Sequence, residues 1–250
     1  MAINKSTLRT IDVLELLATK KELTLTEISD ELQMPMSSTS DIMQALQKRQ
    51  MVELADERAR TYKIGVKNFL IGNAYLSNIS IVDIAKPYLI KLSEQTKNTA
   101  FLARLSGNDS IVYLHKCEPI DTFVSTVNIG SSADVTVTAL GKVILAYNEW
   151  LQKKMYATKL PKVTANSITD VNILKEQLKN VIKNKYALDR FEYDERVNCV
   201  AFPIFDQNGK VEHSFSVAGG SFENRDLDKE IELGLEYSKQ ISLRLGFTEN

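Results

Sequence analysis

Apolar positions near the start of the chain recur every three or four residues, which is the spacing of amphipathic helices. The first such run covers residues 7–18, with Ser6 or Thr7 placed to cap its start. A second helix is expected to open at residues 24–27, because Thr-Leu-Thr-Glu fits a capping box. A proline then interrupts the pattern, and a third helix is expected over residues 37–49.

After residue 50 the pattern changes to the alternation of apolar and polar positions that is typical of strands. Residues 51–54 and 61–64 alternate in this way, and the polar segment 55–60 between them predicts a hairpin. Helical spacing returns over residues 66–80. The order of helix, helix, turn, helix and hairpin predicts a winged helix-turn-helix followed by a connecting helix.

Beyond residue 80 the chain mixes helical and strand-like segments, which predicts an α+β domain. Helices are expected over residues 81–97, with a bend or restart near Pro87, and over residues 138–147, 170–184 and 227–245. Two hairpins are expected, one with strands 99–105 and 110–116 and the other with strands 197–205 and 210–218.

The composition is that of an ordinary globular protein, with 44% hydrophobic and 25% charged residues in a chain of 250. The formal net charge of −1 gives no global sign of nucleic-acid affinity. Residues 1–66 carry nine Lys or Arg and ten Asp or Glu. Any DNA binding must therefore depend on a few well-placed cations, because attraction to phosphates needs positive charge along the DNA backbone.

The cysteine content and the absence of targeting signals predict a cytoplasmic protein with no membrane partner. Cys117 and Cys199 are too few for a disulfide framework, and both are expected to be reduced. Asp12 and Glu15 interrupt the first apolar stretch, which argues against a signal peptide. No run approaches the roughly 18 apolar residues of a membrane span.

The helix over residues 37–49 is the candidate reader of DNA, because a major groove about 12 Å wide admits one helix. Its outward face carries short hydrogen-bonding side chains, and its first amides can hold a phosphate. Basic residues of the hairpin suit a wing against the DNA backbone. The candidate DNA contacts are Arg9, Ser37, Ser38, Ser40, Asp41, Gln44, Arg58, Arg60 and Lys63. The alternative is that the serines are only caps on a solvated face.

Several segments, in order along nearly the whole chain, resemble the IclR family of bacterial transcriptional regulators. They are Met34-Pro35-Met36-Ser37-Ser38-Thr39, Tyr62-Lys63-Ile64-Gly65, Pro87-Tyr88-Leu89 through Leu92, Thr138-Ala139-Leu140-Gly141-Lys142 with Leu145-Ala146, Tyr186-Ala187-Leu188-Asp189 followed by Asn198-Cys199-Val200-Ala201-Phe202-Pro203-Ile204, and Ile241-Ser242 with Leu245-Gly246. The resemblance implies a winged helix-turn-helix over residues 1–66, a linker helix over 67–80 and a GAF-like effector-binding domain over 81–250. It also implies a homodimer or dimer of dimers on double-stranded operator DNA, with repression favoured over activation and no cofactor.

Three positions depart from the family pattern. Asp41 lies where the family often has Arg, and its carboxylate would repel phosphate and favour a cytosine amino group. Lys185 replaces a frequent Gly, which suggests an altered turn before Tyr186. Ala218 stands where some relatives carry a second serine, which would remove one hydrogen bond to a ligand.

The resemblance implies an effector pocket formed by Ala139, Leu140, Asp189, Val197, Cys199 and Ser216. The first two lie at an expected helix start, where unpaired amides favour an anion such as a carboxylate. The aspartate can accept hydrogen bonds from ligand hydroxyls, so a small organic acid, hydroxylated or a sugar acid, is the expected effector. The alternatives are that the aspartate only caps a turn and that the cysteine is a small buried hydrophobe.

The sequence offers little for other functions. It contains no G-x-G-x-x-G, no P-loop spacing around Gly141-Lys142 and no G-x-S-x-G. A metal site from His115, Cys117, Cys199 and His213 is conceivable if the last two pair across strands, but no C-x-x-C or H-x-x-x-H reinforces it. We therefore expect no enzyme and no bound metal. The alternatives are an enzyme, or a metabolite sensor whose winged helix contacts protein.

Overall fold

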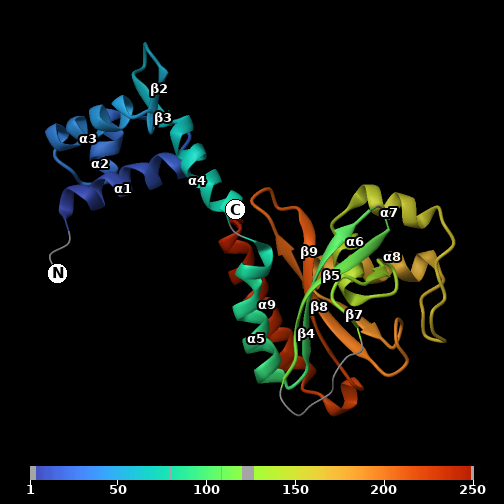
Figure 1. Ribbon diagram of the computed structural model, residues 1–250. Coiled ribbons are helices and arrows are strands. Elements are labelled where there is room, and N and C mark those ends of the chain that lie inside the picture. Colours follow the sequence, from blue (N-terminus) through green and yellow to red (C-terminus); the bar gives the residue numbers. More distant parts are fainter. Residues whose placement is uncertain (1–3, 79, 108, 120–126, 249–250) are drawn as a thin grey trace. The chain divides into compact units, whose positions relative to one another are not determined.

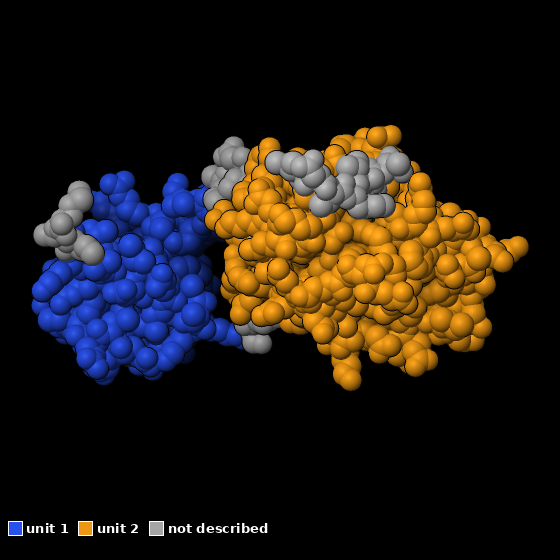
Figure 2. Space-filling model, turned by 90° about the horizontal axis from the view of Figure 1, so that it is seen from below, with its two compact units in different colours: residues 1–79 blue, residues 80–250 orange. Residues whose placement is uncertain are grey.

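The computed structural model of the chain describes residues 4–78, 80–107, 109–119 and 127–248, without the side chains of residues 73–78. The chain forms two compact units, Met1–Ile79 and Ser80–Asn250. Figure 1 shows their secondary structure, and Figure 2 shows the two units as space-filling surfaces. Each unit has its own hydrophobic core, so each is described by itself.

The first unit combines helices with a small antiparallel sheet. Its elements are α1 (Lys5–Thr19), β1 (Leu23–Thr24), α2 (Leu25–Glu31), α3 (Met36–Lys48), β2 (Val52–Asp56), β3 (Thr61–Ile64) and α4 (Val66–Asn78). The predicted hairpin is present as β2 and β3. The two-residue strand β1, which the sequence pattern did not predict, pairs with the other side of β3, so the sheet order is β1-β3-β2.

Of the two helix N-caps that the sequence predicted in this unit, one is correct and one is wrong. The capping box is confirmed, since the Thr24 hydroxyl accepts from the Glu27 amide at 3.3 Å and the Glu27 carboxylate accepts from the Thr24 amide at 2.7 Å. The prediction that Ser6 or Thr7 caps α1 is wrong. The cap is Asn4, whose side-chain oxygen accepts from the Ser6 and Thr7 amides, because the helix begins one turn earlier than its apolar pattern.

One face of α3 packs into the core of the first unit and the opposite face is left to solvent. Its buried residues are Thr39, Ile42, Met43 and Leu46, which recur at the three- and four-residue spacing of one helical face. They meet Val13 and Leu17 of α1, together with Ile28 of α2 and Val52 of β2, in one apolar cluster. This packing orients α3, and it leaves the polar side of the helix available for contacts outside the unit.

The second unit is an antiparallel sheet with helices on both faces, as the α+β prediction required. Its elements are α5 (Ile81–Thr96), β4 (Thr99–Ser106), β5 (Ser110–Cys117), β6 (Ser132–Asp134), α6 (Ala139–Ala146), α7 (Glu149–Tyr156), α8 (Val171–Asn184), β7 (Ala187–Arg190), β8 (Asn198–Phe205), β9 (Val211–Gly219), a short 3-10 turn (Phe222–Asn224) and α9 (Leu227–Arg244). The strand order is β6-β5-β4-β9-β8-β7. Helices α5 and α9 lie along one face, and α6, α7 and α8 lie on the other (Figure 1).

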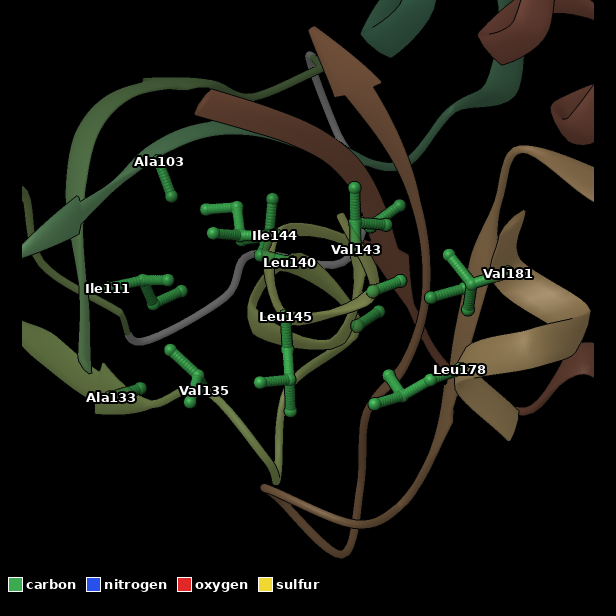
Figure 3. Packing of buried hydrophobic residues seen from close by; sticks show 14 of the residues in the cluster. Ala103, Ile111, Ala133, Val135, Leu140, Val143, Ile144, Leu145, Leu178 and Val181 are labelled. Carbon is green, nitrogen blue, oxygen red and sulfur yellow. The ribbon is translucent and has the colours of Figure 1, made fainter. Parts of the chain in front are cut away.

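Helix α6 is the centre of the core of this unit. All eight of its residues are buried, and Figure 3 shows its apolar side chains between the sheet and α8. Gly141 is required because a Cβ at this position would collide with the backbone of Val135. Thr138 caps the helix by accepting from the Gly141 amide at 3.0 Å. The start of α6 is therefore held in one position against the sheet.

Helix α5 passes through Pro87 as a single helix, so of the expected bend or restart the restart is wrong. The turn before Tyr186 explains the departure at Lys185, which is the C-cap of α8 in the left-handed region at φ 60°. Glycine adopts this conformation without strain, whereas a lysine does so at some energetic cost. The backbone conformation at Lys185 is therefore one that suits a glycine.

Candidate DNA-contact surface and ligand pocket

The polar side of α3 carries five of the nine predicted DNA contacts. Ser37, Asp41 and Gln44 are exposed, and Ser38 and Ser40 are half-buried. The Gln44 side-chain amide donates to the Ser40 hydroxyl at 3.3 Å. This face combines hydrogen-bonding groups with one carboxylate, as the sequence indicated.

The turn of the β2–β3 hairpin presents two exposed arginines, Arg58 and Arg60. The Asp56 carboxylate holds this turn by accepting from the amides of Arg58 at 2.6 Å and Ala59 at 2.9 Å. Lys63 differs from the two arginines because its ammonium lies 3.5 Å from the Glu53 carboxylate. The hairpin therefore offers its two arginines more readily than its lysine.

A surface groove brings part of the candidate set together. It is lined by Ser40, Met43, Gln44 and Gln47 of α3, by Thr24, Leu25 and Thr26 at the start of α2, and by Ala59, Arg60 and Tyr62 of the hairpin. Three of the predicted DNA contacts, Ser40, Gln44 and Arg60, thus share one hollow. Arg9, Ser37, Ser38, Asp41, Arg58 and Lys63 do not line it. Among the other lining residues, Gln47 could be placed on the outward face of α3 from the sequence alone. Nothing in the sequence indicated that Thr26 would line a groove, since it only lies within the capping box.

The second unit contains a cavity lined by all six residues of the predicted effector pocket. The lining consists of Phe101, Tyr113, Val127, Thr138, Ala139, Leu140, Asp189, Tyr193, Asp194, Val197, Cys199, Ser216 and Ala218. The cavity leaves about 30 Å³ for the centre of a water-sized molecule. Because one water needs roughly 10–15 Å³ by this measure, the side-chain positions leave room for only a few heavy atoms.

The cavity lining combines two kinds of chemistry. Ala139 and Leu140 are the first residues of α6, and their amides precede the first intrahelical hydrogen bonds and favour an anion. On the adjacent strands β8 and β9 lie Cys199 and Ser216. The Ser216 hydroxyl is buried and has no hydrogen-bond partner among the described residues. A ligand oxygen in the cavity would satisfy it.

Asp189 belongs both to the cavity and to the turn after β7. Its side chain is 2% exposed, and one carboxylate oxygen accepts from the Glu192 amide at 2.7 Å. Burial raises the pKa of Asp189 to about 7, and the Glu192 charge adds to this, while bonds from the Glu192 and Tyr193 amides and the charge of Lys142 oppose it. Asp189 therefore caps its turn, as one interpretation of the sequence expected, and it also lines the cavity.

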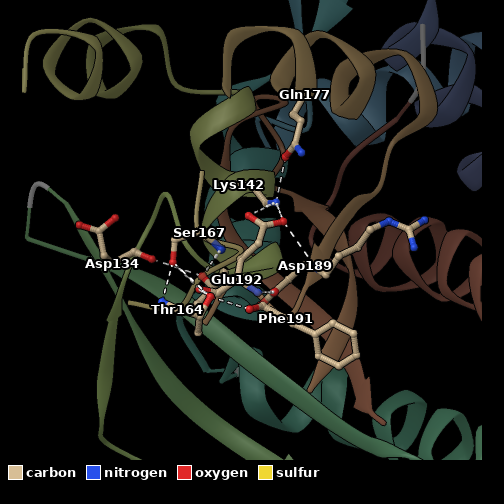
Figure 4. A network of polar contacts seen from close by, with 11 residues as sticks. Asp134, Lys142, Thr164, Ser167, Gln177, Asp189, Phe191 and Glu192 are labelled. Atoms are coloured by element: carbon tan, nitrogen blue, oxygen red, sulfur yellow. Dashed lines mark hydrogen bonds and ion pairs between the residues drawn. The ribbon is translucent and has the colours of Figure 1, made fainter. Parts of the chain in front are cut away.

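A buried polar network holds this turn next to the cavity (Figure 4). The Lys142 ammonium lies 2.6 and 2.8 Å from the two oxygens of Glu192, and it donates to Gln177 at 2.9 Å. The hydroxyls of Thr164 and Ser167 donate to the Glu192 carbonyl at 3.1 and 2.8 Å. Sequence reasoning missed Lys142, because a charged residue in an apolar helix gives no indication of its partner.

The conceivable pairing of His213 with Cys199 across strands does not occur. His213 lies opposite Ile204 on β8 and Arg104 on β4, whereas Cys199 lies opposite Ala218. Burial, followed by the charge of Arg104, lowers the pKa of His213 to about 4. Within the ranges that the structure describes, no three His, Cys, Asp or Glu side chains gather as metal ligands would.

Comparison with known proteins gives a consistent result for both units. The family model for the C-terminal domain of the bacterial transcriptional regulator IclR matches residues 73–243, and that for the IclR helix-turn-helix domain matches residues 6–55. The HTH-type transcriptional regulator BhcR of Paracoccus denitrificans is 31% identical over 220 residues, covering 87% of this chain and 78% of BhcR.

Two solved structures share the fold over nearly the whole chain. The Agobacterium tumefaciens repressor BlcR matches with a TM-score of 0.82 at 22% identity, covering 98% of both chains. An IclR homolog from Microbacterium hydrocarbonoxydans, complexed with 4-hydroxybenzoate, matches with a TM-score of 0.61 at 17% identity, covering 96% of this chain and 99% of that one.

These features define a transcriptional regulator with an N-terminal helix-turn-helix DNA-binding domain and a C-terminal α+β domain. The chain belongs to the IclR family of bacterial transcriptional regulators. None of the helices in the described residues has the length and apolar character needed to cross a membrane.

Proposed function

We propose that the protein represses transcription by binding operator DNA, and that a small carboxylic acid in the cavity of the second unit controls this binding. The observation that carries the proposal is the convergence of Ala139, Leu140, Asp189, Val197, Cys199 and Ser216 on one cavity. The similar BlcR is a repressor by name, and the homolog from Microbacterium hydrocarbonoxydans holds an aromatic acid. Both names agree with the proposal.

The DNA contact proposed for the first unit uses α3 in the major groove and the hairpin against the backbone. The proposed contacts are Arg9, Ser37, Ser38, Ser40, Asp41, Gln44, Arg58, Arg60 and Lys63. Because the unit is slightly acidic, single units should bind weakly, and paired units on two half-sites should bind much more tightly.

A homodimer or a dimer of dimers is proposed as the DNA-binding form. In α4, Val66, Phe69, Leu70 and Ile71 are 59%, 69%, 55% and 56% exposed. Four large apolar side chains within six positions of one helix are unusual for a surface that stays in contact with water. A second copy of the chain would cover them.

In the proposed mechanism, the acid binds with its carboxylate at the start of α6 and its other oxygens near Asp189 and Ser216. Binding favours one arrangement of the subunits, and the operator affinity changes by the difference in ligand affinity between the arrangements. Linkage requires that operator DNA change the affinity for the acid by the same factor.

The decisive experiment is a gel shift of the full-length protein on the DNA upstream of its own gene. Retardation that weakens steeply with salt and resists nonspecific competitor DNA is expected. A panel of small carboxylic acids, screened first by thermal shift, should contain one that changes the retardation. Failure of the protein to bind its own upstream DNA, together with turnover of one of these acids, would contradict the proposal and favour an enzyme.

A further inference from the structure

Asp189 is the carboxylate near the cavity that lacks a cation. Its two acidic neighbours are paired, Glu192 with the Lys142 ammonium at 2.6 Å and Asp194 with the Arg196 guanidinium at 2.9 Å. Within the described part of the chain, Asp189 forms no ion pair, and it accepts hydrogen bonds only from the backbone of its own turn. An ionised carboxylate that is buried without a cation is strongly disfavoured.

We next consider the titratable groups on each element that packs against Asp189. Helix α6 contributes Lys142, which Glu192 already neutralises. The turn after β7 contributes Glu192, Tyr193 and Asp194, while β8 contributes Cys199 and β5 contributes Tyr113. Arg225 acts on Cys199 but is bound to Glu230 at 2.6 Å. Both cations in this set, Lys142 and Arg225, are already paired with another carboxylate, so neither is left to pair with Asp189.

The other groups that line the cavity, and its small size, indicate which class of ligand fits. The start of α6 attracts one carboxylate, and the buried Ser216 hydroxyl requires one more oxygen. The limited space excludes a six-carbon sugar acid in the present side-chain positions. A ligand carboxylate would place a second negative charge in the same small cavity as Asp189, and two carboxyl groups that share a site retain one proton between them.

We propose that the cavity binds a short-chain hydroxy or oxo acid together with one proton, which Asp189 carries and donates in a hydrogen bond to the ligand. This inference rests on the proposed ligand site in the second unit. The proton comes from solvent, and no covalent bond of the protein or the ligand changes. Asp189 thereby makes ligand binding depend on pH, while the limited space of the cavity restricts the ligand to small acids.

As a consequence, the affinity of the protein for the acid should fall as the pH rises. While Asp189 is protonated in the free protein, binding needs no proton uptake and the affinity is constant. The pKa of Asp189 lies at about 7 before the ligand enters, and the ligand charge raises it further. Above that pH each bound acid takes up a proton, so the affinity falls by up to about tenfold for each pH unit.

The test is calorimetric titration of the full-length protein with pyruvate and with lactate from about pH 5.5 to about pH 8.5. At the alkaline end we expect uptake of up to one proton, measured from the heats in two buffers of different ionisation enthalpy. Asp189→Asn keeps a hydrogen-bond donor and acceptor in the same shape, so it should bind the acid with an affinity that is independent of pH.

Asp194→Asn is the matched control, since Asp194 lines the same cavity but its hydrogen bonds to Arg196 lower its pKa. This variant should keep the wild-type slope. The proton uptake would be contradicted if the ligand affinity depended on pH equally in wild type and Asp189→Asn, or if the wild-type affinity did not depend on pH. Neither result would bear on the proposed role as a transcriptional regulator. If neither acid binds at any pH, the short-chain acid is the wrong ligand class. The gel shift without ligand tests the regulator independently.

Discussion

At the scale of single residues, Lys142 shows how much of the pocket depends on one buried charge. The side chain is fully buried in an apolar helix, and its stability there depends on Glu192 and Gln177. The same pair fixes the turn that carries Asp189 into the cavity. A substitution at Lys142 therefore affects both the core and the proposed ligand site.

Lys142→Met should destabilise the protein by about 3–5 kcal/mol, because it leaves Glu192 buried without a partner. Urea unfolding followed by circular dichroism measures this loss. The double variant Lys142→Met with Glu192→Met removes both charges and should recover most of the stability. If the single variant loses less than about 1 kcal/mol, Glu192 does not depend on this lysine.

Asp189 predicts a stability that falls as the pH rises. Its pKa increases from 3.8 to about 7 on folding, so between these values the folded state binds more protons than the unfolded state. The free energy of unfolding contributed by this group therefore decreases from about pH 4 to about pH 7 and is constant above that. In thermal melts, the difference in Tm between wild type and Asp189→Asn should grow in favour of wild type on acidification. A difference that is independent of pH would show that folding does not raise the pKa of Asp189.

At the scale of elements, the packing of α6 against the sheet determines the position of the candidate anion site. Gly141→Ala should destabilise the second unit by about 1–3 kcal/mol, as overpacking does, because Val135 backbone atoms occupy the added Cβ position. Gly72→Ala in α4 is the matched control, since nothing lies within 4 Å of a Cβ there. That change should be neutral or stabilising by up to about 1 kcal/mol. Equal effects in denaturant unfolding would contradict the tight packing.

The hairpin of the first unit predicts unequal roles for its cations. Arg60 lines the groove beside α3, whereas Lys63 is paired with Glu53. Arg60→Ala should weaken operator binding and reduce the slope of log affinity against log salt by about one. Lys63→Ala should have a smaller effect, because the wild-type lysine must first leave its carboxylate. Fluorescence anisotropy at several salt concentrations compares the two, and a larger loss for Lys63→Ala would reverse the assignment.

At the scale of the whole molecule, the proposed pairing of subunits can be tested at the exposed apolar side chains of α4. Phe69→Glu places a charge among the exposed apolar side chains of α4. It should shift the protein toward monomer in light scattering and weaken operator binding by more than tenfold, while each unit keeps its thermal stability. Lys67→Glu, an exposed polar position on the same helix, controls for charge alone. An unchanged oligomer in Phe69→Glu would exclude this surface as the contact.

The sequence predicted the secondary structure best where the pattern is long and ends in a recognisable signal. Helix α8 was expected at 170–184 and spans Val171–Asn184, and the Thr24 capping box is confirmed. The strands β6 and β7 span three and four residues, which is too short for alternation to be distinguished from a loop. Helix α7, with eight residues, was also not predicted.

What the sequence by itself determined is the class of the protein, because periodicity and ordered motifs are local and survive without coordinates. The two-unit organisation, the buried face of α3 and the capped start of α6 all follow from residues that are close along the chain. Only the tertiary structure decided that the cavity is small, that Lys142 neutralises Glu192 and that Asp189 has no such partner. Charge pairing and desolvation depend on distances between segments far apart in sequence, and chain folding alone sets those distances.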